Sequence, residues 1–356
     1  MNVKIKWLRD KLRILNMQGM IVSNPVNVKY LTNIDAEGIL LITRKENIFI
    51  TDGRYIEVAN SSITIDDEII VCNFKDLTKE DYENFFNFCE NVGFEENYIT
   101  YADYKEFIHR FQINNFEETE YMIEKQRMIK DEEEIECISK ACKLTDDCFD
   151  HLREFIKIGM TEKEVEMEIE KFFKLNGADG NSFDSIVASG KNSSMPHAVP
   201  TDKKIEAGDI VTLDFGCKYK GYSSDMTRTI FVGFIPEHIK PVYNLVLKNQ
   251  IQTTESLKEG ANIRTISKLL ENDFKLNGYE LIHSLGHGVG LDIHEIPYIN
   301  SRNDTNLKEN MVITNEPGIY IPNKFGVRIE DTILITKYGA ECLTKSRRDF
   351  IVVDGR

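Results

Sequence analysis

The stretch Leu281–Glu295, LIHSLGHGVGLDIHE, contains three of the seven histidines of the chain, at His283, His287 and His294. Three glycines alternate through the same window. Histidine is the most common metal ligand among side chains and exchanges protons near neutral pH, while glycine lets the backbone approach a ligand closely. The window is therefore either part of a metal or catalytic site, or a glycine-rich loop with buried structural histidines. The rest of the chain has to distinguish these two possibilities.

The bulk composition narrows the class of protein. A length of 356 residues suggests two domains, and the net charge of −15 argues against nucleic acid or an anionic membrane as a partner. The seven cysteines are scattered without a C-x-x-C pair, so we interpret them as reduced thiols of a cytoplasmic protein. We find neither an apolar run of about 18 residues nor the apolar core of a signal peptide.

Residues 1–120 alternate strand and helix patterns and contain no concentration of catalytic residue types. They are expected to form a small α/β domain. The clearest elements are a helix over Trp7–Met17 and strands over Met20–Val22, Gly38–Ile42 and Asn47–Thr51.

Residues 121–157 show apolar side chains at helical spacing, which predicts one long helix. We interpret its acidic run, Asp131–Glu134, as a solvated face. The domain boundary is expected just before this helix, giving domains over residues 1–120 and 121–356.

A weak internal repeat follows. The segment Gly159–Gly177 and the segment Gly260–Gly278 are offset by 101 residues, and both end in Asn-Gly, a signal for the end of a helix. The first also begins with a capping-box pattern, Thr161 with Glu164. We therefore expect two similar halves related by a pseudo-twofold axis, with a site between them.

Each half then contains a hairpin that carries two acids. In the first, Asp209–Gly233, a turn at residues 218–221 predicts that Asp214 faces Asp225 across the ladder. Directly opposed like charges destabilise a sheet. A cation between them would remove the repulsion, and a solvated sheet face would also tolerate it. The apolar neighbours of Asp214 favour the cation.

The second hairpin, Thr314–Thr336, places Glu316 opposite Glu330 if its turn is centred on Asn323. Pro317 must then lie at an edge or a bulge. Four carboxylates and a histidine suit two divalent cations such as Mn²⁺, Co²⁺ or Fe²⁺, and not a thiolate zinc site. Two such cations about 3.5–4 Å apart can activate a shared water, which predicts metal-assisted hydrolysis.

At these positions the chain resembles the metallopeptidase family with the creatinase/aminopeptidase "pita-bread" fold. The resemblance extends over nearly the whole chain and includes Met195–Ala198, HSLGHGVGLDIHE, Asn315–Gly318 and Gly326–Asp331. It implies a C-terminal α+β pita-bread domain with pseudo-twofold halves, preceded along the chain by a smaller N-terminal α/β domain. The metal ligands that it implies are Asp214, Asp225, His287, Glu316 and Glu330, with Asp225 and Glu330 bridging the two metals.

The resemblance also implies roles for residues that do not bind metal. His197 and His294 match catalytic histidines that bind substrate, and Glu316 matches the group expected to act as general base and then general acid. Arg328 and Tyr320 match residues close to the metals and are expected on the substrate side. His283 is expected to be structural or to support a ligand.

Residues 1–120 resemble the N-terminal domain of the family members that cut before proline. We therefore expect an Xaa-Pro peptidase that uses two divalent ions, first Mn²⁺ and otherwise Co²⁺, Fe²⁺ or Zn²⁺, and forms a homodimer. Tyr298 stands where some prolidases carry an arginine, which favours an aminopeptidase P. An Xaa-Pro dipeptidase (prolidase) stays open as the alternative, and a non-catalytic peptide-binding module is a remote one.

Overall fold

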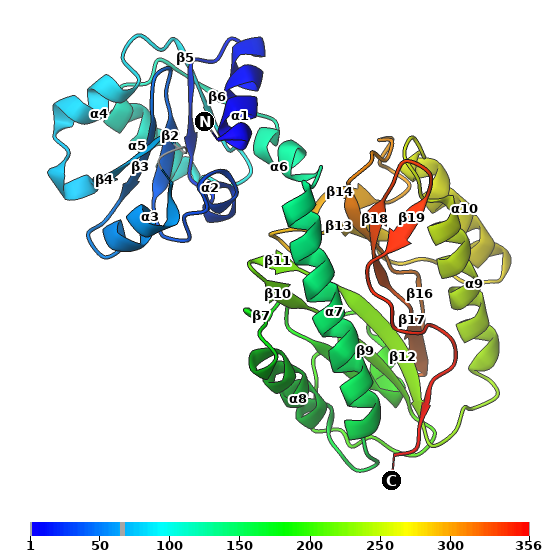
Figure 1. The fold of residues 1–356 in the computed structure, drawn as a ribbon. Coiled ribbons are helices and arrows are strands. Elements are labelled where there is room, and N and C mark those ends of the chain that lie inside the picture. The colour runs from blue at the N-terminus through cyan, green and yellow to red at the C-terminus, as the bar shows by residue number, and fades with distance from the viewer. Residues whose placement is uncertain (1, 65–67, 356) are drawn as a thin grey trace. The chain divides into compact units, whose positions relative to one another are not determined.

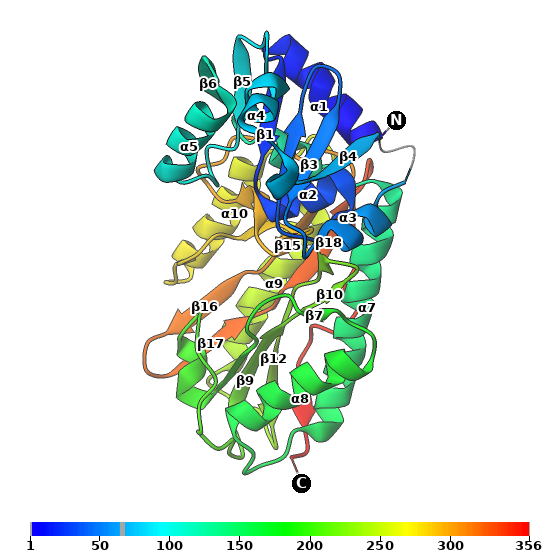
Figure 2. The same cartoon turned by 90° about the vertical axis from the view of Figure 1, so that its left-hand side faces the viewer.

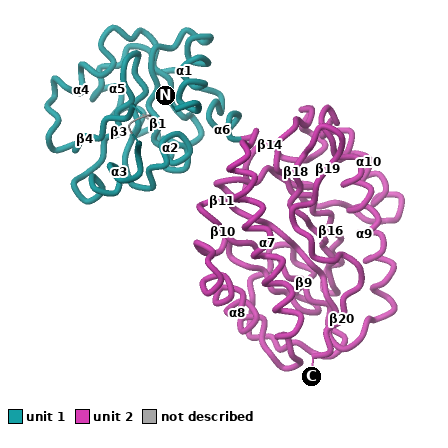
Figure 3. The backbone as a smooth tube through the Cα atoms, viewed as in Figure 1, with its two compact units in different colours: residues 1–127 teal, residues 128–356 magenta. Residues whose placement is uncertain are grey.

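The computed structural model describes residues 2–64 and 68–355. The chain divides into two compact units, residues 1–127 and 128–356 (Figure 3). Within the described ranges, no helix has the length and apolar character needed to cross a membrane.

The first unit is built on a six-stranded sheet with the order β4-β3-β2-β1-β5-β6 (Figure 1). Its strands are β1 (Gly19–Val22), β2 (Ile39–Ile42), β3 (Asn47–Thr51), β4 (Ile69–Asn73), β5 (Asn91–Phe94) and β6 (Asn115–Glu118). Its helices are α1 (Val3–Ile14), α2 (Pro25–Thr32), α3 (Ile56–Ser62), α4 (Lys79–Phe85), α5 (Tyr101–Phe111) and α6 (Met122–Arg127). The three predicted strands are confirmed. The first helix begins earlier than predicted because the side chain of Asn2 accepts from the backbone N–H groups of Lys4 and Ile5.

The prediction of one helix over residues 121–157 is wrong. The chain forms α6 and then α7 (Glu132–Phe155), which starts anew because Asp131 and Glu134 make a reciprocal capping box. Glu134 is buried and accepts a hydrogen bond from the Tyr222 hydroxyl at 2.9 Å. The acidic run is therefore a helix start and not simply a solvated face.

The second unit has two main sheets, β20-β12-β9-β8 and β14-β13-β15-β18-β19. The strands of the first are β8 (Ile186–Ser189), β9 (Ile210–Phe215), β12 (Met226–Val232) and β20 (Val352–Val353). Those of the second are β13 (Gly286–Gly288), β14 (Glu295–Ile299), β15 (Val312–Asn315), β18 (Asp331–Ile335) and β19 (Ala340–Cys342). Smaller pieces are β7 (Gly180–Asn181), β10 (Cys217–Tyr219), β11 (Tyr222–Ser223), β16 (Gly318–Ile321) and β17 (Phe325–Arg328).

Helices cover the two sheets separately (Figure 2). Helix α7 and α8 (Glu162–Leu175) pack against β9 and β12, while α9 (Lys240–Ser256) and α10 (Ile263–Leu276) pack with β15 to β18. Each half thus has its own hydrophobic core, and the two sheets meet between them.

The two halves repeat each other in detail. Helices α8 and α10 have the same length at an offset of 101 residues, and Gly159 and Gly260 before them both have positive φ. The N–H of Gly159 donates to Ile205 O and that of Gly260 to Leu307 O, both at 2.8 Å. The expected pseudo-twofold relation is therefore present as repeated backbone hydrogen bonds.

The register predicted for the first hairpin is wrong by two residues. Asp214 pairs with Thr227, not with Asp225, because the turn contains only Lys220 and Gly221. Both have positive φ, as a two-residue type I′ turn requires. A shift of two residues keeps side chains on the same face of the sheet, so Asp214 and Asp225 are diagonal neighbours on that face.

The register predicted for the second hairpin is confirmed. Asn315 pairs with Asp331 on one side of Glu316 and Glu330, and Gly318 pairs with Arg328 on the other. The two glutamates lie opposite each other in the break between these ladders. Pro317 also lies in this break, where a missing N–H costs no ladder hydrogen bond.

A buried ionic cluster joins the two sheets behind the break. Asp331 is fully buried and accepts from Arg228 Nη2 at 2.7 Å, Gln250 Nε2 at 2.6 Å and Arg348 Nε at 2.5 Å. Arg228 is itself 1% exposed and also donates to the carbonyl oxygen of Glu330. Strands β12 and β18 are therefore fixed to each other through charged groups that water does not reach.

We predict that Asp331→Ala lowers the free energy of unfolding of the second unit by about 3–5 kcal/mol, because it leaves Arg228 buried without its carboxylate partner. Urea denaturation followed by circular dichroism measures this change. The control is Asp349→Ala, which removes a carboxylate from an exposed ion pair with Arg347. Equal stability of the Asp331 variant and the control would contradict the role of the cluster.

Candidate metal centre

The five predicted metal ligands come from both sheets and line one cavity of about 590 Å³. Asp214 lies in β9 and Asp225 directly before β12, while His287 lies in β13. Glu316 and Glu330 lie in the ladder break of the second hairpin. The structure thus brings together all five residues, which span 116 positions of the chain from the first to the last.

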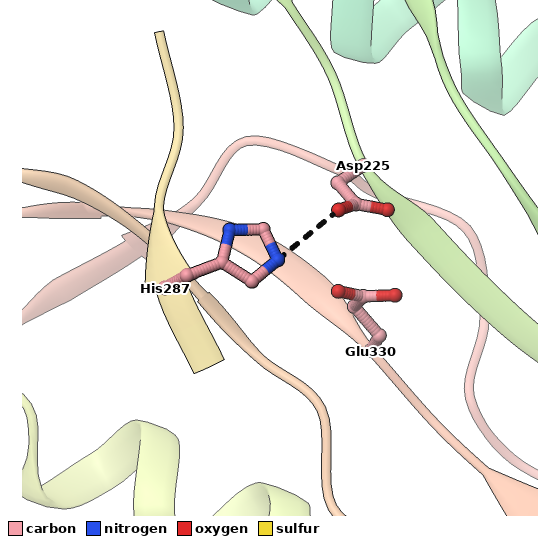
Figure 4. A group of neighbouring side chains, drawn as sticks. All are labelled: Asp225, His287 and Glu330. Carbon is pink, nitrogen blue, oxygen red and sulfur yellow. Dashed lines mark ion pairs between the residues drawn. The ribbon is translucent and has the colours of Figure 1, made fainter. Parts of the chain in front are cut away.

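Three of these residues form the tightest group. One potential ligand atom from each of Asp225, His287 and Glu330 lies within 4.8 Å of the others (Figure 4). His287 Nε2 is 3.5 Å from Asp225 Oδ2 and 3.5 Å from Glu316 Oε1. His287 Nδ1 lies 3.0 Å from the carbonyl oxygen of Gly288, to which it can donate. That bond leaves the lone pair of Nε2 facing the carboxylates, as in metal-ligating histidines.

Glycines let the strand that carries His287 lie close to its neighbours. A Cβ atom on Gly286 would be 2.1 Å from the carbonyl oxygen of Thr314, and one on Gly288 would be 2.5 Å from that of Ile296. On Gly290 it would be 2.5 Å from the Glu295 carboxylate. The alternating glycines of the window are thus required for packing between β13, β14 and β15.

Arg328 connects several parts of the site. Its Nη2 donates to Asp214 Oδ2 at 2.5 Å, and its Nε donates to Thr227 Oγ1 at 3.0 Å. Its Nη1 donates to the Tyr320 hydroxyl at 2.6 Å and to the carbonyl oxygen of Pro196 at 3.2 Å. A single buried guanidinium therefore orients one predicted ligand and the segment that carries His197.

The donor set fits divalent cations. Asp225 and Glu330 are 4% and 2% exposed, and burial together with neighbouring carboxylates raises the pKa of both well above the usual range. Burial also raises the pKa of Glu316 to about 8. Asp214 Oδ1 and Asp225 Oδ1 are buried without a hydrogen-bond donor. Buried carboxylates without donors are stabilised by a cation, and divalent ions with oxygen and imidazole ligands match this set.

The remaining histidines occupy different positions around the cavity. His197 and His294 both line it with exposed side chains, and the His294 ring packs at 4.4 Å against the His287 ring. His283 also lines the cavity, and its Nε2 is 3.0 Å from the Tyr320 hydroxyl. Burial lowers the pKa of His283 to about 4, so the ring is neutral and its Nε2 can accept a hydrogen bond from the Tyr320 hydroxyl.

Two supporting contacts did not follow from the sequence. Thr227 Oγ1 donates to Glu330 Oε2 at 2.6 Å. The correct two-residue turn would have placed Thr227 opposite Asp214, and so among the predicted ligands. Lys130 Nζ donates to Glu295 Oε2 at 3.1 Å, and both side chains are almost fully buried. This ion pair joins the segment before α7 to the residue after His294. It spans 165 positions, and no local pattern signals it.

Comparison with known proteins agrees with this geometry. The model of metallopeptidase family M24 matches residues 136–337, and that of the creatinase/prolidase N-terminal domain matches residues 4–129. An Xaa-Pro dipeptidase of Pyrococcus furiosus is 40% identical, over 94% of this chain and 96% of that protein. An uncharacterized peptidase of Bacillus subtilis is 38% identical, over 99% of this chain and all of that one.

Solved structures give the same result. The Xaa-Pro dipeptidase from Bacillus anthracis has a TM-score of 0.93 at 38% identity and covers 98% of this chain and 99% of its own. The X-Pro aminopeptidase from Thermotoga maritima has a TM-score of 0.88 at 32% identity, with 97% and 100% covered. These likenesses establish the pita-bread fold with its N-terminal creatinase-type domain and a peptidase that uses divalent metal. The chain belongs to metallopeptidase family M24, among its Xaa-Pro peptidases.

Proposed function

We propose that the protein is an Xaa-Pro dipeptidase, the alternative left open by the sequence, and not an aminopeptidase P. The supporting observation is full-length similarity at 38–40% identity to proteins named Xaa-Pro dipeptidase. The X-Pro aminopeptidase of Thermotoga maritima is less similar, at 32%. The preference for aminopeptidase P depended on Tyr298, which lines the cavity. Its hydroxyl can donate a hydrogen bond to the carboxylate of a dipeptide in place of an arginine.

We further propose Asp214, Asp225, His287, Glu316 and Glu330 as the ligands of two divalent cations, with Mn²⁺ as the first candidate. Bound there, the cations would polarise the scissile carbonyl and activate water. An Xaa-Pro bond is a tertiary amide without an N–H. Enzymes that hold the substrate through that N–H fail on it, whereas a site that acts on the carbonyl needs no such donor.

Protein side chains supply the remaining chemistry in this proposal. Glu316 takes the proton from the attacking water and returns it to the proline nitrogen, which must be protonated to leave. His197 and His294 hold the substrate through hydrogen bonds. Arg328 and Tyr320 act on the substrate side by fixing the segment before His197, since Arg328 bonds Tyr320 and the carbonyl oxygen of Pro196.

The family resemblance also supports a homodimer. A cytoplasmic location agrees with the seven free cysteines.

The substrate assay tests the proposed activity directly. With Mn²⁺ or Co²⁺ supplied, we expect hydrolysis of Xaa-Pro dipeptides and at least about tenfold lower kcat/KM on Xaa-Pro-Yaa tripeptides, a difference of about 1.4 kcal/mol in transition-state binding. Efficient cleavage of the tripeptides would instead support the aminopeptidase P activity predicted from the sequence. No cleavage of either class with any metal would reject the enzyme.

Asp225→Asn is predicted to lose bound metal and activity together, because the amide removes a charge that is proposed to bridge both ions. Metal content after dialysis and calorimetric titration with Mn²⁺ measure the loss. The matched control is Asp292→Asn, an acid two residues before His294 that is not a proposed ligand. Full metal content in the Asp225 variant would contradict its assignment.

His197→Ala and His294→Ala are predicted to keep their metal and lose turnover by about 10²–10⁴-fold, the contribution typical of a positioned proton donor or acceptor. Metal analysis and steady-state kinetics on one dipeptide measure the two quantities. Loss of metal from either variant would show that the histidine is a ligand, against the proposal.

A further inference from the structure

Two carboxylates that the metal centre does not use line the same cavity. Glu166 lies in α8, and Asp184 lies in the segment that leads into β8. They are electrostatic neighbours: burial, with the charges of Glu170 and Asp184, raises the pKa of Glu166. Asp184 is exposed and Glu166 half-buried, so both can meet a ligand that enters from solvent.

The charge of Lys163 acts on Glu166, but among the described residues this lysine forms no ion pair with either acid. Within residues 2–64 and 68–355, neither carboxylate has an ion pair. Lys163, the nearest lysine on the same helix, pairs with Asp202 at 3.1 Å. Arg328 is the one lysine or arginine in the described lining, and it bonds Asp214 and three other protein groups. A ligand cation would therefore meet unneutralised negative charge at this place.

The strand pairing gives the location of the acids. Ile186 pairs with Asp214 across β8 and β9, and the N–H of Ser182 donates to Gly216 O at 3.0 Å. The chain advances four residues from Ser182 to Ile186 while its partner advances two, so Asp184 lies in a bulge beside the end of β9. Asp184 lies two residues before Ile186, and both residues line the cavity together with Asp214. The acids thus lie on the side of the cavity formed by the first half, which also carries Asp214.

The surroundings suit a long side chain with a charged end. Phe183, Ile186 and Val199 line the cavity beside the acids and offer apolar surface. Lysine and arginine bury their methylene stems on such surface while the charged group stays hydrated. The cavity of about 590 Å³ is within the usual range for small-ligand sites.

An independent observation indicates that this cavity takes a ligand. Asp214 Oδ1 and Asp225 Oδ1 belong to residues that are more than nine-tenths buried, they lack hydrogen-bond donors, and both residues line the cavity. The two acids therefore line a cavity whose buried, donor-free carboxylate oxygens suit a bound cation.

We propose that Asp184 and Glu166 form a subsite for the cationic side chain of lysine or arginine in the residue before proline. This inference rests on the proposed dipeptidase function, because a dipeptide offers just two positive groups, its α-ammonium and that side chain. The preferred substrates are then Lys-Pro and Arg-Pro, and an acidic residue before proline is disfavoured.

The test compares Lys-Pro with norleucine-Pro, which has a similar unbranched side chain without the charge. With the metal-loaded wild-type enzyme we expect kcat/KM to favour Lys-Pro by about fivefold, the size that two partly exposed ion pairs give, and the preference to shrink in 0.5 M salt. In Asp184→Asn/Glu166→Gln the ratio should fall to about one. The control Glu170→Gln removes a charge from the same helix outside the cavity lining and should keep the wild-type ratio.

The outcomes distinguish failure of the side-chain subsite from failure of the dipeptidase function. Equal loss on both substrates in the double variant would mean that the acids bind the α-ammonium, which overturns the side-chain subsite. Equal wild-type rates on both substrates overturn it without any variant. Absence of hydrolysis of both Lys-Pro and norleucine-Pro by the metal-loaded wild type would instead reject the dipeptidase function itself.

Discussion

Mutual repulsion among buried carboxylates is the constraint on which the second unit depends. Asp214, Asp225, Glu316 and Glu330 meet at the junction of two sheets, and burial makes their charges costly. The surrounding structure offsets this cost through donors such as Arg328 and Thr227, but the fully buried oxygens Asp214 Oδ1 and Asp225 Oδ1 have none. A fold that concentrates negative charge in this way reaches its full stability when cations occupy the centre, since metal binding and folding are thermodynamically linked.

Internal duplication explains how the chain collects these acids from distant positions. The same glycine-led helix start recurs after 101 residues, with equivalent backbone hydrogen bonds from Gly159 and Gly260. Each half then places a hairpin toward the other sheet. Each half delivers two acids from a hairpin, diagonally in the first and directly opposed in the second, and the four carboxylates line one cavity.

Much of this arrangement could be predicted from the sequence. The second hairpin followed from its turn at Asn323, and the five residues that line the cavity as proposed ligands followed from motifs with fixed spacing. The first register was wrong because positive φ at Lys220 is not evident from the residue type: lysine rarely adopts it, and the residue after it, Gly221, obscured which two residues form the turn. Contacts such as Lys130 with Glu295 depend on tertiary packing over long separations, which local periodicity does not encode.

The break in the second hairpin has a mechanical consequence. The N–H of Glu316 donates to Leu285 O, and that of Glu330 donates to Thr227 O. Glu316 is therefore bonded to the residue before β13, and Glu330 is bonded to β12 of the opposite half. Separating the two sheets would therefore pull the two glutamates apart. Cations bound between the glutamates would resist that separation. The cations proposed for catalysis would then also stabilise the contact between the two sheets.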